Sequence, residues 1–116
     1  MNRSPTQRDG DAAEDLALEH LQRAGLSLVA RQFACRLGEI DLIMADGAQL
    51  VFVEVRRRRS SAFGGAAASV SASKRRRVTL AAQLWLQQHH GDRWPDCRFD
   101  VCAIEGERFE WIRGAF

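Results

Sequence analysis

The chain of 116 residues is 46% hydrophobic and carries a formal net charge of +2. This length suits one compact domain spanning residues 1–116, with enough apolar side chains to bury a core without covalent cross-links. The three cysteines, Cys35, Cys97 and Cys102, form no C-x-x-C pair, which argues against a disulfide framework or a zinc knuckle. No run approaches about 18 apolar residues and the first residues lack an apolar segment, so we expect a cytoplasmic protein outside the membrane.

Basic residues are concentrated in the middle of the chain. Between Val55 and Gly91 there are eight Arg or Lys residues and no Asp or Glu, whereas the remaining segments hold nine basic and fifteen acidic residues. The middle therefore carries +8 and the rest −6. A block of one sign attracts a polyanion and accelerates its encounter, although a charge run also describes an ordinary solvated face.

The first predicted element is an amphipathic helix over residues 11–24, which Gly25 ends. Its apolar side chains recur at three- and four-residue spacing, at Ala13, Leu16, Ala17, Leu21 and Ala24. The polar residues 1–9 before it are expected to be flexible. Glu14 flanks the apolar stripe and has two competing interpretations, a capping box with Asp11 or a functional role.

Three strands are predicted next, over residues 26–35, 36–45 and 49–56. Asp46-Gly47 is a hairpin turn signal between the second and the third, so the three strands would form an antiparallel meander. Because side chains alternate along a strand, residues 39, 41 and 43 are expected on one face of the second strand. On the third strand, Phe52, Glu54 and Arg56 are expected on one face, with Val51, Val53 and Val55 on the other.

The second half begins with a segment rich in Gly, Ala and Ser, residues 57–73, which is predicted to be a mobile loop. A helix follows from Lys74 to about His89, and strands are predicted over 97–104 and 109–112. The expected fold class is therefore α/β or α+β, with helices packed on a central mixed sheet. The cations at residues 74–77, in the first turn of this helix, oppose the helix dipole, and a phosphate bound there would offset that repulsion. The competing interpretation is a solvated, arginine-rich helix start that binds no phosphate.

Two carboxylates on the strands that flank the hairpin turn indicate a catalytic site. Asp41 and Glu54 can meet across adjacent strands, and Arg56 shares a strand face with Glu54. Phosphodiester hydrolysis with Mg²⁺ or Mn²⁺ needs hard oxygen ligands of this kind and a cation near the phosphate. Glu39 is assigned to the surface. Asp100 is predicted to be a structural hydrogen-bonding residue or a partner of Arg98.

Five motifs occur in order along nearly the whole chain: G-E-I-D-L-I at 38–43, V-F-V-E-V-R at 51–56, F-G at 63–64, V-S-A-S-K-R-R-R at 70–77 and R-F-D-V at 98–101. In this order they resemble the YraN-like family of uncharacterised bacterial proteins. That family is similar to Holliday-junction resolvases and to restriction-endonuclease-like nucleases of the PD-(D/E)xK type. The resemblance implies a restriction-endonuclease-like core of a helix, a three-strand meander, a helix and one or two further strands.

The resemblance also implies that Glu14, Asp41 and Glu54 bind the metal and form the catalytic site together with position 56. The family pattern has lysine there, and this chain has Arg56. Arginine stays protonated, so it can stabilise charge but cannot act as a base. Lys74 is the sole lysine of the chain, and we hypothesise that it approaches the phosphate instead.

The leading hypothesis is a Mg²⁺- or Mn²⁺-dependent endonuclease that acts on DNA, with branched DNA as a candidate substrate and a homodimer as the form suited to a two-fold symmetric junction. The DNA backbone would be held by Arg57, Arg58, Arg59, Lys74, Arg75, Arg76 and Arg77, which favours recognition of shape over sequence. Two alternatives stay open. One is a nucleic-acid-binding module whose catalysis has weakened, with Arg56 as the sign. The other is a protein-interaction domain whose basic loop meets an acidic partner.

Overall fold

The computed structural model describes residues 5–58 and 71–116. The elements in chain order are α1 (Pro5–Arg23), β1 (Ser27–Cys35), β2 (Gly38–Asp46), β3 (Gln49–Arg58), α2 (Ala72–His90), β4 (Cys97–Glu105) and β5 (Arg108–Ile112). This order is the predicted one, and both strands expected after the second helix are present. Within these two ranges, no helix is long and apolar enough to cross a membrane.

The five strands form one sheet in the order β1-β2-β3-β4-β5. β1, β2 and β3 make the predicted antiparallel meander, β4 pairs parallel with β3, and β5 returns antiparallel to β4. A parallel pair requires a crossover connection, and α2 lies in that connection. The mixed α/β fold expected from the sequence is confirmed, and it is consistent with a restriction-endonuclease-like core.

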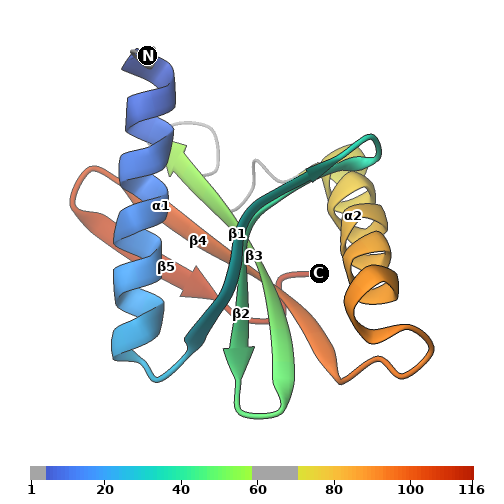
Figure 1. Cartoon of the computed structure of the whole chain (residues 1–116). Coiled ribbons are helices and arrows are strands. Elements are labelled where there is room, and N and C mark those ends of the chain that lie inside the picture. The colour runs from blue at the N-terminus through green and yellow to red at the C-terminus, as the bar shows by residue number, and fades with distance from the viewer. Residues whose placement is uncertain (1–4, 59–70) are drawn as a thin grey trace.

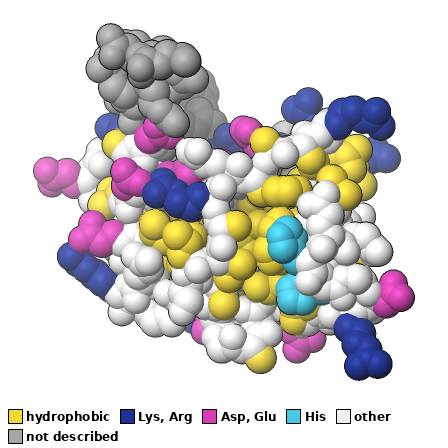
Figure 2. Space-filling model, viewed as in Figure 1, with side chains coloured by type: hydrophobic (Ala, Val, Ile, Leu, Met, Phe, Trp, Pro, Cys, Tyr) yellow, Lys and Arg dark blue, Asp and Glu magenta, His cyan; other side chains and the backbone are white. Residues whose placement is uncertain are grey.

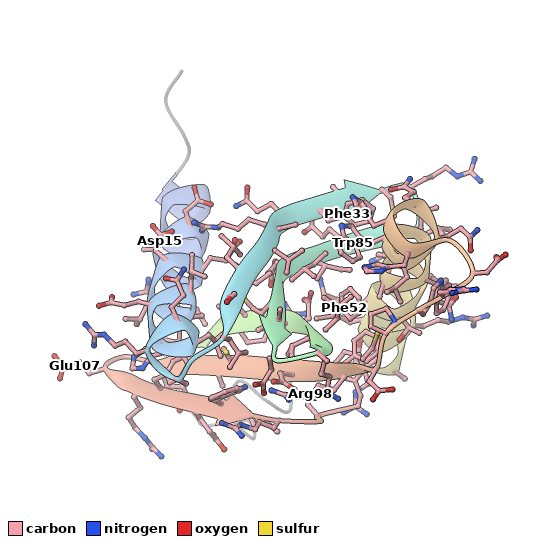
Figure 3. The ribbon with its side chains drawn as sticks, turned by 60° about the horizontal axis from the view of Figure 1, so that its bottom comes forward. Asp15, Phe33, Phe52, Trp85, Arg98 and Glu107 are labelled. Carbon is pink, nitrogen blue, oxygen red and sulfur yellow. The ribbon has the colours of Figure 1, made fainter. Side chains whose placement is uncertain are left out.

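The two helices lie on opposite sides of the sheet (Figure 1), and each covers its own apolar cluster. Alternation along β3 separates the two clusters. Phe52 packs with Trp85 of α2, whereas Val53 packs with Leu21 of α1. Figure 3 shows Phe33, Phe52 and Trp85 gathered between the strands and α2. The side-chain alternation predicted for β3 is therefore present in the structure.

The start of α1 differs from the prediction. The helix begins at Pro5, and proline suits a first helical turn because its missing N–H would have no helical partner there. Residues 5–9, which were expected to be flexible, therefore belong to α1, while residues 1–4 lie outside the described residues. Asp11 and Glu14 are consequently inside the helix, and the predicted capping box is wrong.

The predicted loop over residues 57–73 is shorter at both ends. β3 continues through Arg58, which pairs with Glu105 of β4. α2 already begins at Ala72, because the Ser71 Oγ caps it by accepting the Lys74 N–H at 3.1 Å. Residues 59–70 of that predicted loop lie outside the described residues.

Asp100 is a fully buried carboxylate that anchors the C-terminal segment. It accepts hydrogen bonds from Arg98 Nε at 3.1 and 3.2 Å, from Trp111 Nε1 at 2.9 Å and from the Gly114 N–H at 2.9 Å. Arg98 also donates through Nη1 to Asp46 at 2.9 Å. The prediction of a structural role and of Arg98 as its partner is confirmed.

We expect Asp100→Ala to lower the free energy of unfolding by about 3–5 kcal/mol, because it leaves several buried donors without an acceptor. Urea denaturation measures this change. Asp92→Ala, which removes an exposed carboxylate, serves as the control and should change stability by less than about 0.5 kcal/mol. Equal effects of the two substitutions would contradict the anchoring role.

Candidate functional site

The candidate site lies where β2 and β3 separate. Their register runs from the hairpin turn as far as Leu42 and Val53. Beyond this pair, the Asp41 Oδ2 accepts a hydrogen bond of 2.8 Å from the backbone N–H of Val55. Ile40 and Leu42 pack into different clusters, although regular alternation would place them on one face. The alternation expected over residues 39–43 is therefore interrupted at Asp41. At this point the Asp41 carboxylate, in place of a backbone carbonyl of β2, accepts the hydrogen bond from the Val55 N–H of β3.

Glu54 is a buried carboxylate with an exposed fraction of only 1%. No hydrogen bond of normal geometry reaches either of its oxygens, although the backbone N–H of Asp41 is close enough to lower its pKa. Its ion pair with Lys74 is loose, with 3.6 Å between Oε2 and Nζ. Burial, followed by the charge of Asp41, raises the pKa of Glu54 to about 8, while Lys74 and Arg56 act in the opposite direction. A buried charge with so few partners is costly, so this position favours a bound cation.

Asp41 forms one electrostatic cluster with Glu54 and with Glu14 of α1. Burial raises the pKa of Asp41, and the hydrogen bond from Val55 and the charge of Lys74 oppose that rise. Burial and then the negative charge of Asp41 raise the pKa of Glu14. Asp41 is therefore close enough to influence both Glu14 and Glu54, and the three predicted acids come from three different elements.

Arg56 lies within electrostatic reach of the same acids. Its charge lowers the pKa of both Asp41 and Glu54, and no described residue accepts a hydrogen bond from its Nε. The sequence prediction placed this cation beside the two carboxylates, and the structure brings all three residues together.

β1 supplies two hydrogen-bond partners of Glu14 that were not predicted from the sequence. Arg31 donates through Nη2 to Asp15 at 2.8 Å and to Glu14 at 3.5 Å. Gln32 donates through Nε2 to Asp11 at 3.2 Å and to Glu14 at 3.4 Å. Gln32 has a φ of 52°, a left-handed backbone that costs a residue with a side chain about 1 kcal/mol or more. No motif in the sequence marks either residue, because their roles depend on the packing of β1 against α1.

Basic side chains gather at the same end of the molecule. Figure 2 shows them over the start of α2 and the tip of the β1–β2 hairpin. Lys74 and Arg77 line a cavity there, Arg76 is exposed, and the Arg75 guanidinium lies over the Phe116 ring at 5.6 Å. Arg57 is exposed near the end of β3.

The DNA-binding prediction also includes Arg58 and Arg59. The backbone of Arg58 is described as the last residue of β3, whereas its side chain is not. Arg59 lies outside the described residues. Among the described side chains, the basic patch therefore consists of Lys74 to Arg77 at the start of α2 and Arg57 near the end of β3.

The donor set fits a hard divalent cation held by two carboxylates. Among residues 5–58 and 71–116, no group of three or more His, Cys, Asp or Glu side chains is arranged to hold a metal ion. Mg²⁺ is usually bound through one or two carboxylates, with water and substrate phosphate as its other ligands. Asp41 and the two Glu54 oxygens without donors match that mode of binding. Glu14 as a third ligand stays a prediction.

The fold and this site define a class of protein, a mixed α/β core with an acidic cluster where two central strands separate. The chain matches the sequence model described as "Uncharacterised protein family UPF0102" over residues 13–104. It belongs to this family, which confirms the resemblance inferred from the motifs.

Relatives from several bacteria extend over nearly the whole chain. A UPF0102 protein of Alkalilimnicola ehrlichii is 50% identical over 113 residues, covering 97% of this chain and 90% of that protein. One from Pseudomonas syringae is 49% identical over 123 residues, covering 100% and 98%. One from Ralstonia nicotianae is 56% identical over 111 residues, covering 92% and 85%.

Glu54 should make stability depend on pH. Its pKa in the folded protein is about 8, against an ordinary 4.5, so its contribution to stability is complete below about pH 4.5 and is lost as the pH rises to 8. We expect Glu54→Gln to remove this loss, which corresponds to up to about 5 kcal/mol. Urea denaturation in EDTA at about pH 5 and pH 9 measures it. Glu107→Gln, at an exposed site, is the control, and a constant difference between wild type and Glu54→Gln would refute the assignment.

Proposed function

We propose that this protein is a metal-dependent endonuclease that hydrolyses phosphodiester bonds of DNA. The observation that carries the proposal is the pair of Asp41 and Glu54, because Glu54 is buried and no hydrogen bond of normal geometry reaches either of its oxygens. A carboxylate that serves the fold is normally satisfied, as Asp100 is by its three partner residues. Glu54 lacks such bonds and lies beside a basic surface, which is the arrangement that a cation and a phosphate would complete.

The residues of the site have distinct tasks in this proposal. Asp41 and Glu54 would hold Mg²⁺ or Mn²⁺, which would supply Lewis-acid stabilisation and a more acidic bound water. The Val55 N–H orients the Asp41 carboxylate at 2.8 Å. The guanidinium of Arg56 would stabilise negative charge on the phosphate. Glu14 adds negative charge next to Asp41 and so favours a cation there.

The basic residues at the start of α2 would hold the DNA backbone. A phosphate suits this place because it meets both the cationic side chains and the positive end of the helix dipole. Contacts of this kind position a substrate without reading its bases, so we propose selection by DNA shape, with branched DNA as the first substrate to test. A two-fold symmetric junction would be cut by two copies of the chain.

Arg56 favours a second candidate, a nucleic-acid-binding module on the same scaffold. In that case Asp41 and Glu54 would not catalyse strand cleavage, and the basic surface alone would bind the nucleic acid. Both candidates predict that the protein binds DNA, and only the endonuclease predicts that it cuts a strand.

A cleavage assay separates the two candidates. With labelled branched and linear DNA in Mg²⁺ or Mn²⁺, we expect cleavage by the wild type and a loss of at least about 100-fold in Asp41→Asn and in Glu54→Gln. Asp92→Asn, exposed after α2, is the control and should retain activity. Binding without cleavage in all these proteins would select the binding module.

Salt dependence tests the basic surface. Each phosphate contact adds about 0.9 to the slope of log affinity against log salt concentration on duplex DNA. We expect Arg76→Ala to reduce this slope by about 0.9 and to weaken binding equally for different sequences. Arg93→Ala, beyond the other end of α2, is the matched control. The absence of any salt-dependent affinity in the wild type would favour an interaction with a protein partner instead.

A further inference from the structure

A cavity of about 280 Å³ lies between the β1–β2 hairpin and the start of α2. Its charged lining consists of Arg36, Lys74 and Arg77 against Glu39, so positive charge predominates. Water takes up about 30 Å³ per molecule in the liquid, so the space admits a phosphate group together with several waters. The sequence reading left Arg36 unassigned, because its place beside α2 is decided by the packing of the hairpin.

Gly38 determines how closely the hairpin approaches α2. A Cβ at this position would lie 2.7 Å from the Arg77 carbonyl oxygen, a distance that real side chains do not adopt. The glycine therefore brings one wall of the cavity against the helix. A second cavity of about 290 Å³, lined in part by Glu14 and Asp41, shares Ala34 and Glu39 with the first. The first cavity, the basic cavity, therefore lies next to the acidic site, which is formed by Glu14, Asp41 and Glu54.

Lys74 belongs to both the basic cavity and the acidic site. It lines the basic cavity, and its Nζ forms the 3.6 Å ion pair with Glu54. Its side chain is 26% exposed, whereas Glu54 is 1% exposed. The pair has no hydrogen bond, and the flexible four-carbon stem of lysine allows the ammonium to turn toward solvent. The Lys74 ammonium can therefore contact either the buried Glu54 carboxylate or an anion bound in the basic cavity.

We propose that the basic cavity is a subsite for a phosphate of the DNA strand, and that Lys74 exchanges between two anions. It pairs with Glu54 in the metal-free protein, and it contacts that phosphate once a divalent cation is bound at Asp41 and Glu54. This inference rests on the proposed function and adds a residue that links metal binding to substrate binding.

The exchange follows from the charges at the site. An ionised Glu54 needs a cation because it is buried, and in the absence of metal Lys74 is the cation that lies 3.6 Å from it. Two cations at one carboxylate repel each other, so the ammonium leaves when a divalent cation is present. The Lys74 ammonium, no longer paired with Glu54, then lies at the start of α2, where its positive charge attracts a phosphate. Metal and DNA thereby increase each other's affinity, as linkage requires.

The first experiment measures metal affinity without DNA. The dependence of the melting temperature on Mg²⁺ concentration reports affinity for the metal. We expect Lys74→Met to bind Mg²⁺ about tenfold more tightly than the wild type, since a competing positive charge is gone. Arg93→Met removes a charge at the opposite end of α2 and should leave the affinity unchanged. Lys74→Gln provides a second variant with a polar side chain.

The second experiment measures coupling to DNA. A short labelled duplex is titrated with and without Ca²⁺, which takes the same hard oxygen ligands. We expect Ca²⁺ to raise the DNA affinity of the wild type about tenfold and that of Lys74→Met about twofold or less, whereas Arg93→Met keeps the full rise. Arg36→Ala and Arg77→Ala should weaken binding of DNA in Ca²⁺, because both residues line the cavity.

Three results would overturn the exchange. Equal or weaker Mg²⁺ binding by Lys74→Met and Lys74→Gln would show that Lys74 does not compete for Glu54, and DNA cleavage by the wild type would still stand. An unchanged Ca²⁺ effect in Lys74→Met would show that Lys74 does not reach the phosphate. A wild type that binds no divalent cation would refute both this inference and the metal site of the proposed function.

Discussion

The buried carboxylate of Glu54 is the constraint on which the rest of the site depends. A charge that is 1% exposed and lacks hydrogen-bond donors is stable only if positive charge lies close to it. The start of α2 provides Lys74, and β3 itself provides Arg56. The same burial raises the pKa of Glu54 to about 8, so a proton and the Lys74 ammonium compete for one carboxylate near neutral pH, and the proposed metal ion would be a third competitor.

Asp100 shows how this fold treats a carboxylate that serves stability alone. It is as deeply buried as Glu54, yet side-chain and backbone donors surround it and tie the C-terminal segment to β4. Two buried acids within one small sheet thus have opposite hydrogen-bonding environments. Such local destabilisation persists where a function requires it and where the surrounding packing is strong enough to tolerate it.

Much of the architecture could be predicted because it depends on local patterns. Alternating apolar residues placed Phe52 and Val53 on opposite faces of β3, and Asp46-Gly47 marked the hairpin. The errors came where distant contacts overrode local signals. Glu14 resembled the partner of Asp11 in a capping box, but α1 begins at Pro5, more than one turn before Asp11, so both residues lie inside the helix. Regular alternation through Asp41 failed because β2 and β3 separate at that point.

The order of the elements, the two faces of β3 and the acids on both strands of a hairpin are encoded locally, because they follow from side-chain periodicity. The contacts of Lys74 with Glu54 and of Arg31 and Gln32 with Glu14 arise from packing, as does the cavity between the β1–β2 hairpin and α2. These contacts join residues far apart in the chain, and their distances depend on strand separation and helix packing. No periodicity along a single chain encodes such distances.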